Sequence, residues 1–266
     1  MRNVRPPAVA GMFYPADPPT LRREVEGHLA AATPSGPGSA RVKAVIAPHA
    51  GYIYSGPTAG FAFAQLAADA AEIRRIVLLG PAHQVALRGL GLPGCDAFAT
   101  PLGEVPVAAE AAWRIASLPQ VVDHVAAHGP EHSLEVELPF LQIVLDEFEL
   151  LPLVVGEATG EEVAEVLEAV WGGPETRIVI SSDLSHYLPY DKARAIDGDT
   201  ARAIVEFEAP LERGRACGGL PIDGLTVVAR QRGLTARLLD LRNSGDTAGD
   251  RHRVVGYGAF DYLEAA

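Results

Sequence analysis

The distribution of apolar residues along the chain predicts alternating strands and helices. Four apolar runs, at 42–47, 75–79, 150–155 and 177–180, have the length of single strands. The first two runs are continuous rather than alternating, which is typical of strands that are buried on both faces of a sheet. We therefore expect a central sheet with helices on both sides.

Between these runs, apolar residues recur at the spacing of helices. Thr159 begins a capping box ahead of an apolar helical face, and Pro57 stands where a first helical residue would. Pro139 lies inside an apolar helical run, so we expect a kink or a late helix start there. Helices are predicted from Pro18 onward and at 57–69, 108–117, 134–145, 159–170, 191–208 and 222–232. Further strands are predicted in 86–107, 234–242 and 253–263, and residues 1–16 are expected to be irregular.

These elements alternate without a change of composition along the chain. The turn-rich segment 33–40 is too short to indicate a linker between domains. With 266 residues, the chain is long enough to bury a sizeable core. We predict one α/β domain over residues 1–266, with a mixed, largely parallel sheet flanked by helices.

The net charge and the cysteine content limit which partners the protein can bind and which cellular compartment suits it. The net charge of −12 disfavours nucleic acid and anionic membranes, because both are bound through basic clusters. The chain has only two cysteines, Cys95 and Cys217, which is no disulfide framework and suits a reducing compartment. No apolar run approaches the roughly 18 residues that span a bilayer, and the N-terminal residues lack the apolar core of a signal peptide. We expect a cytoplasmic protein with no nucleic-acid or membrane partner.

Three predicted strands are followed closely by a histidine, namely His49, His83 and His186. Ligand and catalytic groups of α/β sheets lie at the carboxyl ends of the strands, which share one edge when the strands are parallel. Histidine is the commonest metal ligand and the usual general base near neutral pH. Any one of these residues alone would be interpreted as a histidine bonded within a loop, but the coincidence of three favours a shared site.

Two further signals are weaker. Cys217 precedes two glycines and a proline at an apparent helix start, where the thiolate form is favoured; a small buried apolar side chain is an equal alternative. His132 and Glu135 lie three positions apart and would share a helical face, a spacing that occurs in metal sites of helical bundles and also on many exposed helices.

Several common site signatures are absent from the sequence. We find no phosphate-binding loop, no dinucleotide-binding glycine pattern after a strand, no nucleophile elbow and no Cys-x-x-Cys pair. These absences disfavour nucleoside triphosphatases, dinucleotide enzymes, serine hydrolases and zinc ribbons. A mononuclear site with two or three histidines, with or without one thiolate, is the interpretation that remains.

Five motifs follow one another along the chain, namely Pro48-His49-Ala50-Gly51-Tyr52, Gly80-Pro81-Ala82-His83, Glu131-His132-Ser133-Leu134-Glu135, Ser181-Ser182-Asp183-Leu184-Ser185-His186 and Cys217-Gly218-Gly219-Leu220-Pro221-Ile222. With Ala10-Gly11-Met12-Phe13-Tyr14-Pro15 before them and Gly256-Tyr257-Gly258-Ala259-Phe260 after them, they cover nearly the whole chain. Together they resemble the Memo family, whose bacterial and archaeal members are often called AmmeMemoRadiSam system protein B. The resemblance implies a fold related to that of the class III extradiol dioxygenases, which are ring-opening enzymes with non-haem iron.

The resemblance also implies a ligand set. Family members bind one iron or copper ion through two histidines and a cysteine, and the matching motifs carry these roles to His49, His83 and Cys217. His186 would correspond to the acid/base residue beside the metal, and Asp183 and His132 would line the same pocket. The extradiol enzymes use a carboxylate as third ligand, so a cysteine at this position departs from their pattern and suits copper(I) as well as iron(II).

Three functional hypotheses follow. The first is a metal-dependent redox protein, in which one iron(II) or copper ion is bound per chain, His186 moves protons and Asp183 orients His186 or the substrate. The second is a non-catalytic protein that holds a peptide or a small molecule in the same cleft. The third, suggested only by the family's bacterial name, is a functional link to a radical-SAM enzyme.

Overall fold

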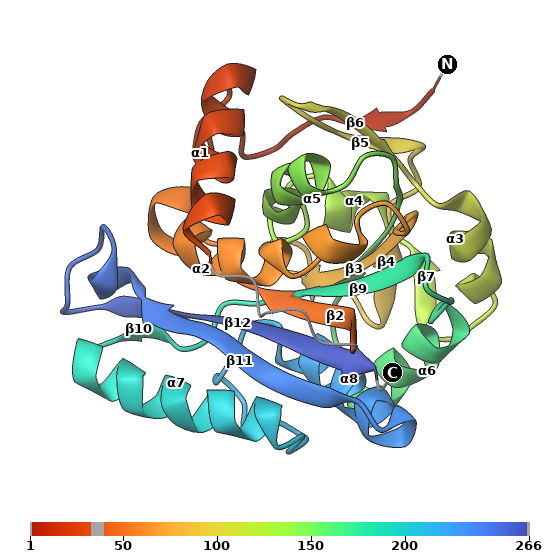
Figure 1. Ribbon diagram of the computed structural model, residues 1–266. Coiled ribbons are helices and arrows are strands. Elements are labelled where there is room, and N and C mark those ends of the chain that lie inside the picture. Colours follow the sequence, from red (N-terminus) through yellow and green to blue (C-terminus); the bar gives the residue numbers. More distant parts are fainter. Residues whose placement is uncertain (1, 33–39, 265–266) are drawn as a thin grey trace.

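The computed structural model describes residues 2–32 and 40–264 (Figure 1). Most of the turn-rich segment 33–40 therefore lies outside the described residues. The main sheet of the described chain has nine strands. Their order is β10 (His186–Leu188), β12 (Val254–Glu264), β2 (Arg41–Ala47), β9 (Thr176–Ser181), β3 (Arg75–Pro81), β8 (Glu149–Val155), β4 (Leu90–Leu92) and β7 (Val121–Asp123), and β11 (Thr235–Asn243) also pairs with β12.

The four predicted apolar strands form the centre of this sheet and run parallel to one another. Strand β9 lies between β2 and β3, and β8 follows on the far side of β3. Ala47 is in register with Ser181, and Leu79 with Ile180, so these strands end close to the same level. Strands β12 and β4 pair antiparallel to the two sides of this centre, which makes the sheet mixed.

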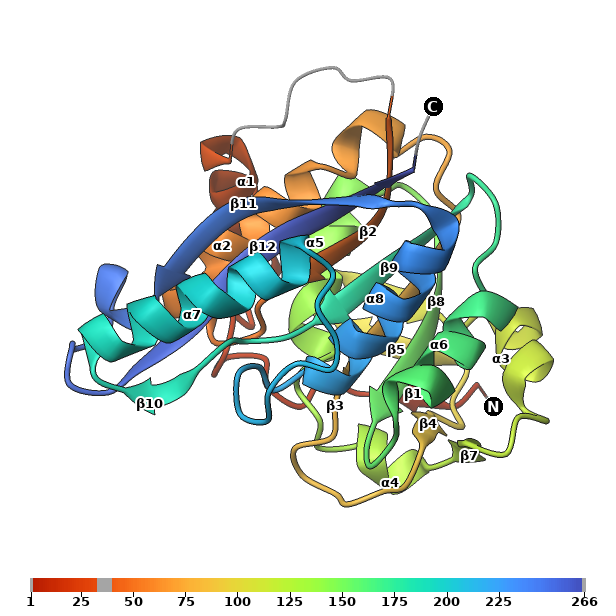
Figure 2. The same cartoon turned by 90° about the horizontal axis from the view of Figure 1, so that it is seen from below.

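Helices cover both faces of the sheet, as Figures 1 and 2 show. Alternate residues along the central strands belong to two separate cores: Val45 and Leu78 lie in one, and Ile46 and Leu79 in the other. The first core is completed by α1 (Pro18–Ala31), α2 (Tyr52–Ala64) and α5 (Leu138–Val144), and the second by α3 (Ala109–Ile115), α6 (Gly160–Ala169), α7 (Tyr190–Val205) and α8 (Gly219–Arg232). Burial on both sides explains why the strands are apolar throughout.

A second, smaller sheet packs beside the first core. It consists of β1 (Val4–Arg5), β5 (Ala97–Thr100) and β6 (Gly103–Pro106), and β5 and β6 form the hairpin predicted within 86–107. The N-terminal residues, predicted to be irregular, thus contribute a two-residue strand parallel to β5. The remaining short elements are α4 (Val125–His128), η1 (Ala67–Asp69), η2 (Glu135–Glu137) and η3 (Ser244–Asp246).

Several local predictions can be compared directly with the structure. The capping box at Thr159 is confirmed, and so is a late helix start at Pro139, because α5 begins at Leu138 after the short helix η2. The prediction that Pro57 begins a helix is wrong, because α2 already begins at Tyr52. The Tyr52 backbone N–H donates to the carbonyl of Phe13, a contact with a distant segment that local spacing does not reveal.

The predicted fold class is confirmed as one α/β domain with a mixed sheet between helical layers. Among residues 2–32 and 40–264, no helix has the length and apolar character required to cross a bilayer.

Candidate metal centre

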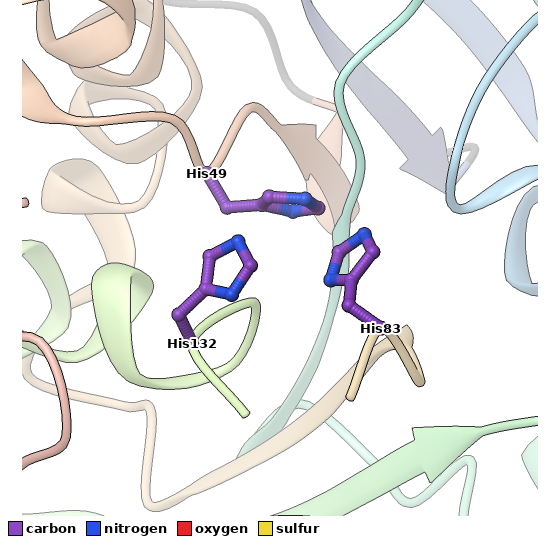
Figure 3. Close-up of side chains that lie close together, drawn as sticks. All are labelled: His49, His83 and His132. Atoms are coloured by element: carbon purple, nitrogen blue, oxygen red, sulfur yellow. The ribbon is translucent and has the colours of Figure 1, made fainter. Parts of the chain in front are cut away.

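Three histidines from separate parts of the chain converge at the carboxyl edge of the parallel strands. His49 follows β2, His83 follows β3, and His132 lies in the loop between α4 and η2. Figure 3 shows their three rings directed toward a common space. One ring nitrogen from each lies within 4.8 Å of the other two, and the ring centroids are 4.8 to 5.5 Å apart. The chain thus brings together three donors of the type that iron, copper and zinc accept.

His49 is buried and held at both its backbone and its ring. Its backbone N–H donates to the Asp183 carboxyl group at 2.9 Å, and its Nδ1 lies 2.7 Å from the Ser181 hydroxyl. Burial, reinforced by the neighbouring histidines, lowers the pKa of His49 well below its usual value. The imidazole is therefore neutral at pH 7, the state in which a ring nitrogen can bind a metal.

His83 is oriented by Glu131, a residue to which the sequence motif assigned no role. Glu131 accepts from the His83 backbone N–H at 2.6 Å and from the His83 Nδ1 at 3.0 Å. Burial would raise the pKa of Glu131, but hydrogen bonds from His83 and from the backbone of Ser133 lower it to about 2. Glu131 is therefore ionised, and it fixes the proton on His83 Nδ1 and leaves Nε2 available, as carboxylates commonly do behind metal-binding histidines.

His132 belongs to the close cluster and not merely to the pocket wall. Its ring stacks on that of His83 with an interplanar angle of 18°, and the ring of Phe13 packs on it with the two ring centroids 4.7 Å apart. Burial lowers the pKa of His132 as well. Glu135, which shares a helical face with His132 in the sequence pattern, instead bonds to Arg5 and Tyr14 and takes no part in the cluster.

Cys217 approaches the cluster from the start of α8. Its Sγ lies 3.4 Å from His49 Nε2 and accepts the backbone N–H of Asp183 at 3.2 Å. Burial, together with the charge of Asp183, raises the pKa of the thiol to about 12. Of the two alternatives that the sequence left open for Cys217, the burial favours the protonated thiol, because desolvation outweighs the effect of the helix start.

The two predicted catalytic residues lie in the same cleft but outside the close cluster. Burial raises the pKa of Asp183 to about 7. His186 does not end β9, which stops at Ser181; it begins β10, and its Nδ1 donates to the Leu184 carbonyl at 2.8 Å. The expected third strand-end histidine is thus replaced in the cluster by His132, which comes from a loop.

The cleft at this edge of the sheet is open and has a volume of about 710 Å³. Its lining includes the four histidines, Asp183 and further aromatic and charged side chains, namely Phe13, Tyr54, Tyr187, Tyr257, Asp250 and Arg253, but not Cys217. A second cavity of about 660 Å³ beside Arg74 and Glu149 is lined by no histidine or cysteine. The two cavities are similar in volume, and it is the histidines of the first that distinguish it as a candidate site.

Taken together, the sheet and its edge define an α/β protein with a candidate metal centre at the carboxyl ends of its parallel strands. The chain belongs to the Memo family: a model of Memo-like proteins matches residues 5–260. This result confirms the resemblance seen in the motifs.

Relatives in several organisms match the chain over nearly its full length. A MEMO1 family protein of Methanothermobacter thermautotrophicus is 37% identical, over 96% of this chain and 98% of the relative. MEMO1 family proteins of Archaeoglobus fulgidus and Aquifex aeolicus are 35% and 37% identical, each over 96% of this chain and 97% of the relative.

Proposed function

We propose that the cleft binds one iron(II) or copper ion per chain through His49, His83 and Cys217, and that the protein is a metal-dependent redox protein. The convergence of three imidazoles at the edge of the sheet is the observation that carries this proposal. The nitrogens expected to bind are His49 Nε2 and His83 Nε2, because the Nδ1 atoms of both rings have hydrogen-bond partners. A bound ion of either element would supply one-electron redox chemistry at this edge.

The position of Cys217 supports a thiolate as third ligand. With metal–nitrogen and metal–sulfur bonds of about 2.1 and 2.3 Å, two donors on one tetrahedral ion lie about 3.6 Å apart. The separation between Cys217 Sγ and His49 Nε2 is 3.4 Å, which fits that value. Because the thiol is protonated in the metal-free chain, metal binding must release its proton. His132 is the competing third donor, since it lies in the close cluster.

The remaining polar groups have supporting tasks in this proposal. His186 donates from Nδ1 to a backbone carbonyl, which leaves its Nε2 free to accept and return a proton within the cleft. Asp183 accepts the backbone N–H of His49 and thereby holds the loop that presents this ligand. Neither residue needs to touch the ion.

Metal analysis of a variant series tests the ligand set. We expect anaerobically purified wild-type protein, loaded with iron(II) or copper(I), to hold about one ion per chain. His49→Ala and His83→Ala should lose the ion, Cys217→Ser should bind it more weakly, and His132→Ala should retain it. His252→Ala, which changes an exposed histidine that does not line the cleft, is the matched control. Loss in His132→Ala with retention in Cys217→Ser would make His132 the third ligand, and equal occupancy in all variants would refute the site.

A second candidate function, ligand binding without turnover, is favoured by the volume of the cleft and by the aromatic side chains that line it. Oxygen uptake by the metal-loaded protein over a panel of catechols separates the two functions. Under the redox proposal, His186→Ala should keep the metal and lose the uptake. Absence of uptake from fully loaded wild-type protein would favour a binding protein for a peptide or small molecule.

A further inference from the structure

Behind His49 lies a buried hydrogen-bond chain that the sequence motifs do not reveal. The Ser181 hydroxyl oxygen has three polar neighbours: His49 Nδ1 at 2.7 Å, the Ser133 carbonyl at 2.6 Å and Glu137 Oε1 at 2.7 Å. Ser181, Ser133 and Glu137 are each fully buried or nearly so. No space for bulk water remains around the hydroxyl, so these three neighbours must satisfy it among themselves.

A hydroxyl has one proton to donate and two lone pairs with which to accept. The Ser133 carbonyl can only accept, so at 2.6 Å it must receive the Ser181 proton; otherwise two oxygen lone pairs would face each other. Both remaining neighbours must then donate to Ser181. His49 does so with a proton on Nδ1, and Glu137 does so as a protonated carboxylic acid.

The surroundings of Glu137 agree with a neutral acid. Its side chain is fully buried, and its second oxygen, Oε2, has no hydrogen-bond partner among the described residues. Burial raises the pKa of Glu137 well above its usual value, and the nearby Asp183 adds to this effect. An ionised carboxylate with one unpartnered oxygen in such a place would be costly, whereas a neutral acid that donates one hydrogen bond is far less so.

We propose that Glu137 is a positioning residue that, as a buried carboxylic acid acting through Ser181, holds His49 in the tautomer with its proton on Nδ1 and with Nε2 directed into the cleft. His83 receives the same tautomer from the ionised Glu131. The two imidazoles are therefore oriented alike, but His83 is backed by a negative charge and His49 by a neutral chain. The consequence for metal affinity rests on the proposed metal centre; the tautomer itself does not.

The tautomer can be measured in the metal-free chain by nitrogen NMR of labelled imidazoles. We expect wild-type His49 to carry its proton on Nδ1 and Glu137→Gln to preserve this state, because the amide N–H can donate to Ser181 in place of the acid. Ser181→Ala should lose the preference. Carbon NMR of the Glu137 carboxyl group should show the protonated form at pH 7.

Two results would overturn the proposal: an ionised Glu137 in the wild-type protein, or a His49 tautomer that changes in Glu137→Gln as it does in Ser181→Ala. Thermal unfolding of each variant shows whether it is folded, and Glu137→Gln remains informative even if Ser181→Ala unfolds. In metal titrations, Glu137→Gln should stay within about threefold of wild type and Ser181→Ala should lose about 10- to 100-fold in affinity. Failure of all proteins to bind metal, with the expected tautomers present, would refute the metal centre and leave the positioning role intact.

Discussion

At the scale of single residues, a hydrogen-bond partner at Nδ1 leaves Nε2 available in three of the four histidines of the cleft, His49, His83 and His186. Glu131 binds Nδ1 of His83, and the Leu184 carbonyl binds Nδ1 of His186. Burial keeps His49 and His132 neutral by lowering the pKa of each. The same desolvation keeps Cys217 protonated in the absence of a metal. Neutral imidazoles and a thiol that must lose its proton are consistent with a site that a cation completes.

A histidine outside the cleft links burial to acid stability. His128 is buried, its Nε2 donates to the Gly91 carbonyl at 2.7 Å, and burial lowers its pKa from 6.5 to about 4. The unfolded chain binds a proton below pH 6.5 while the folded chain does not until about pH 4. Stability is therefore lost as the pH falls through this window.

We expect this histidine to cost the wild-type protein about 2 kcal/mol of unfolding free energy between pH 7 and pH 5. His128→Gln preserves a donor for the Gly91 carbonyl but does not titrate, so it should lose correspondingly less over the same interval. Urea unfolding of both proteins at the two pH values measures the difference. Equal losses would show that His128 takes up its proton as readily in the folded protein as in the unfolded chain.

At the scale of elements, the N-terminal segment forms one wall of the cleft because Glu135 anchors it. Glu135 pairs with Arg5 at 2.7 Å and accepts from the backbone of Ala8 and Val9. The ion pair is buried, with side-chain exposures of 5% and 0%. The anchored residues are followed closely in the chain by Phe13, whose ring packs on that of His132.

Removal of the anchor should destabilise the protein and release this wall. Glu135→Ala leaves the Arg5 guanidinium buried without its partner, which should cost about 3 to 5 kcal/mol in unfolding free energy. The backbone amides of Ala8 and Val9 should also exchange faster with solvent, as measured by hydrogen exchange. Glu104→Ala, which breaks the exposed pair with Arg2, is the control and should cost less than about 1 kcal/mol. Similar costs for both variants would contradict the anchoring role.

At the scale of the whole molecule, one sheet joins the two cores. The central strands contribute alternate side chains to both, and the C-terminal strand β12 pairs with β2, which follows the first helix. Neither core can be exposed without disrupting strands that the other needs. The architecture therefore favours a single cooperative unit.

This architecture predicts coincident unfolding by independent probes. Trp171 is buried in the second core, whereas Trp113 is 79% exposed, so Trp113→Phe leaves fluorescence that reports on the second core alone. We expect the urea midpoint of this fluorescence to coincide with that of far-ultraviolet circular dichroism, which reports on the whole chain. Separate midpoints would indicate two domains.

The sequence by itself determined the central strands, their burial on both faces and part of the site. Continuous apolar runs specify strands such as β2 and β3 because neighbouring residues along the chain are sufficient to define a pattern. The rule that sites lie at strand ends then placed His49 and His83 correctly at one edge. The motifs around them also identified the family.

The family motifs already placed Cys217 and His132 near these two histidines, but only the tertiary structure decided that His132 joins the close cluster and that Glu131 and Glu137 lie behind the rings. His132 and Glu131 come from a loop, and Glu137 reaches Ser181 across 44 positions of the chain, so no local period places them together. The ionisation of Cys217 was equally beyond the sequence, because a helix start favours the thiolate while burial opposes it. The balance depends on how much water the packed fold excludes, and that is a property of the assembled molecule.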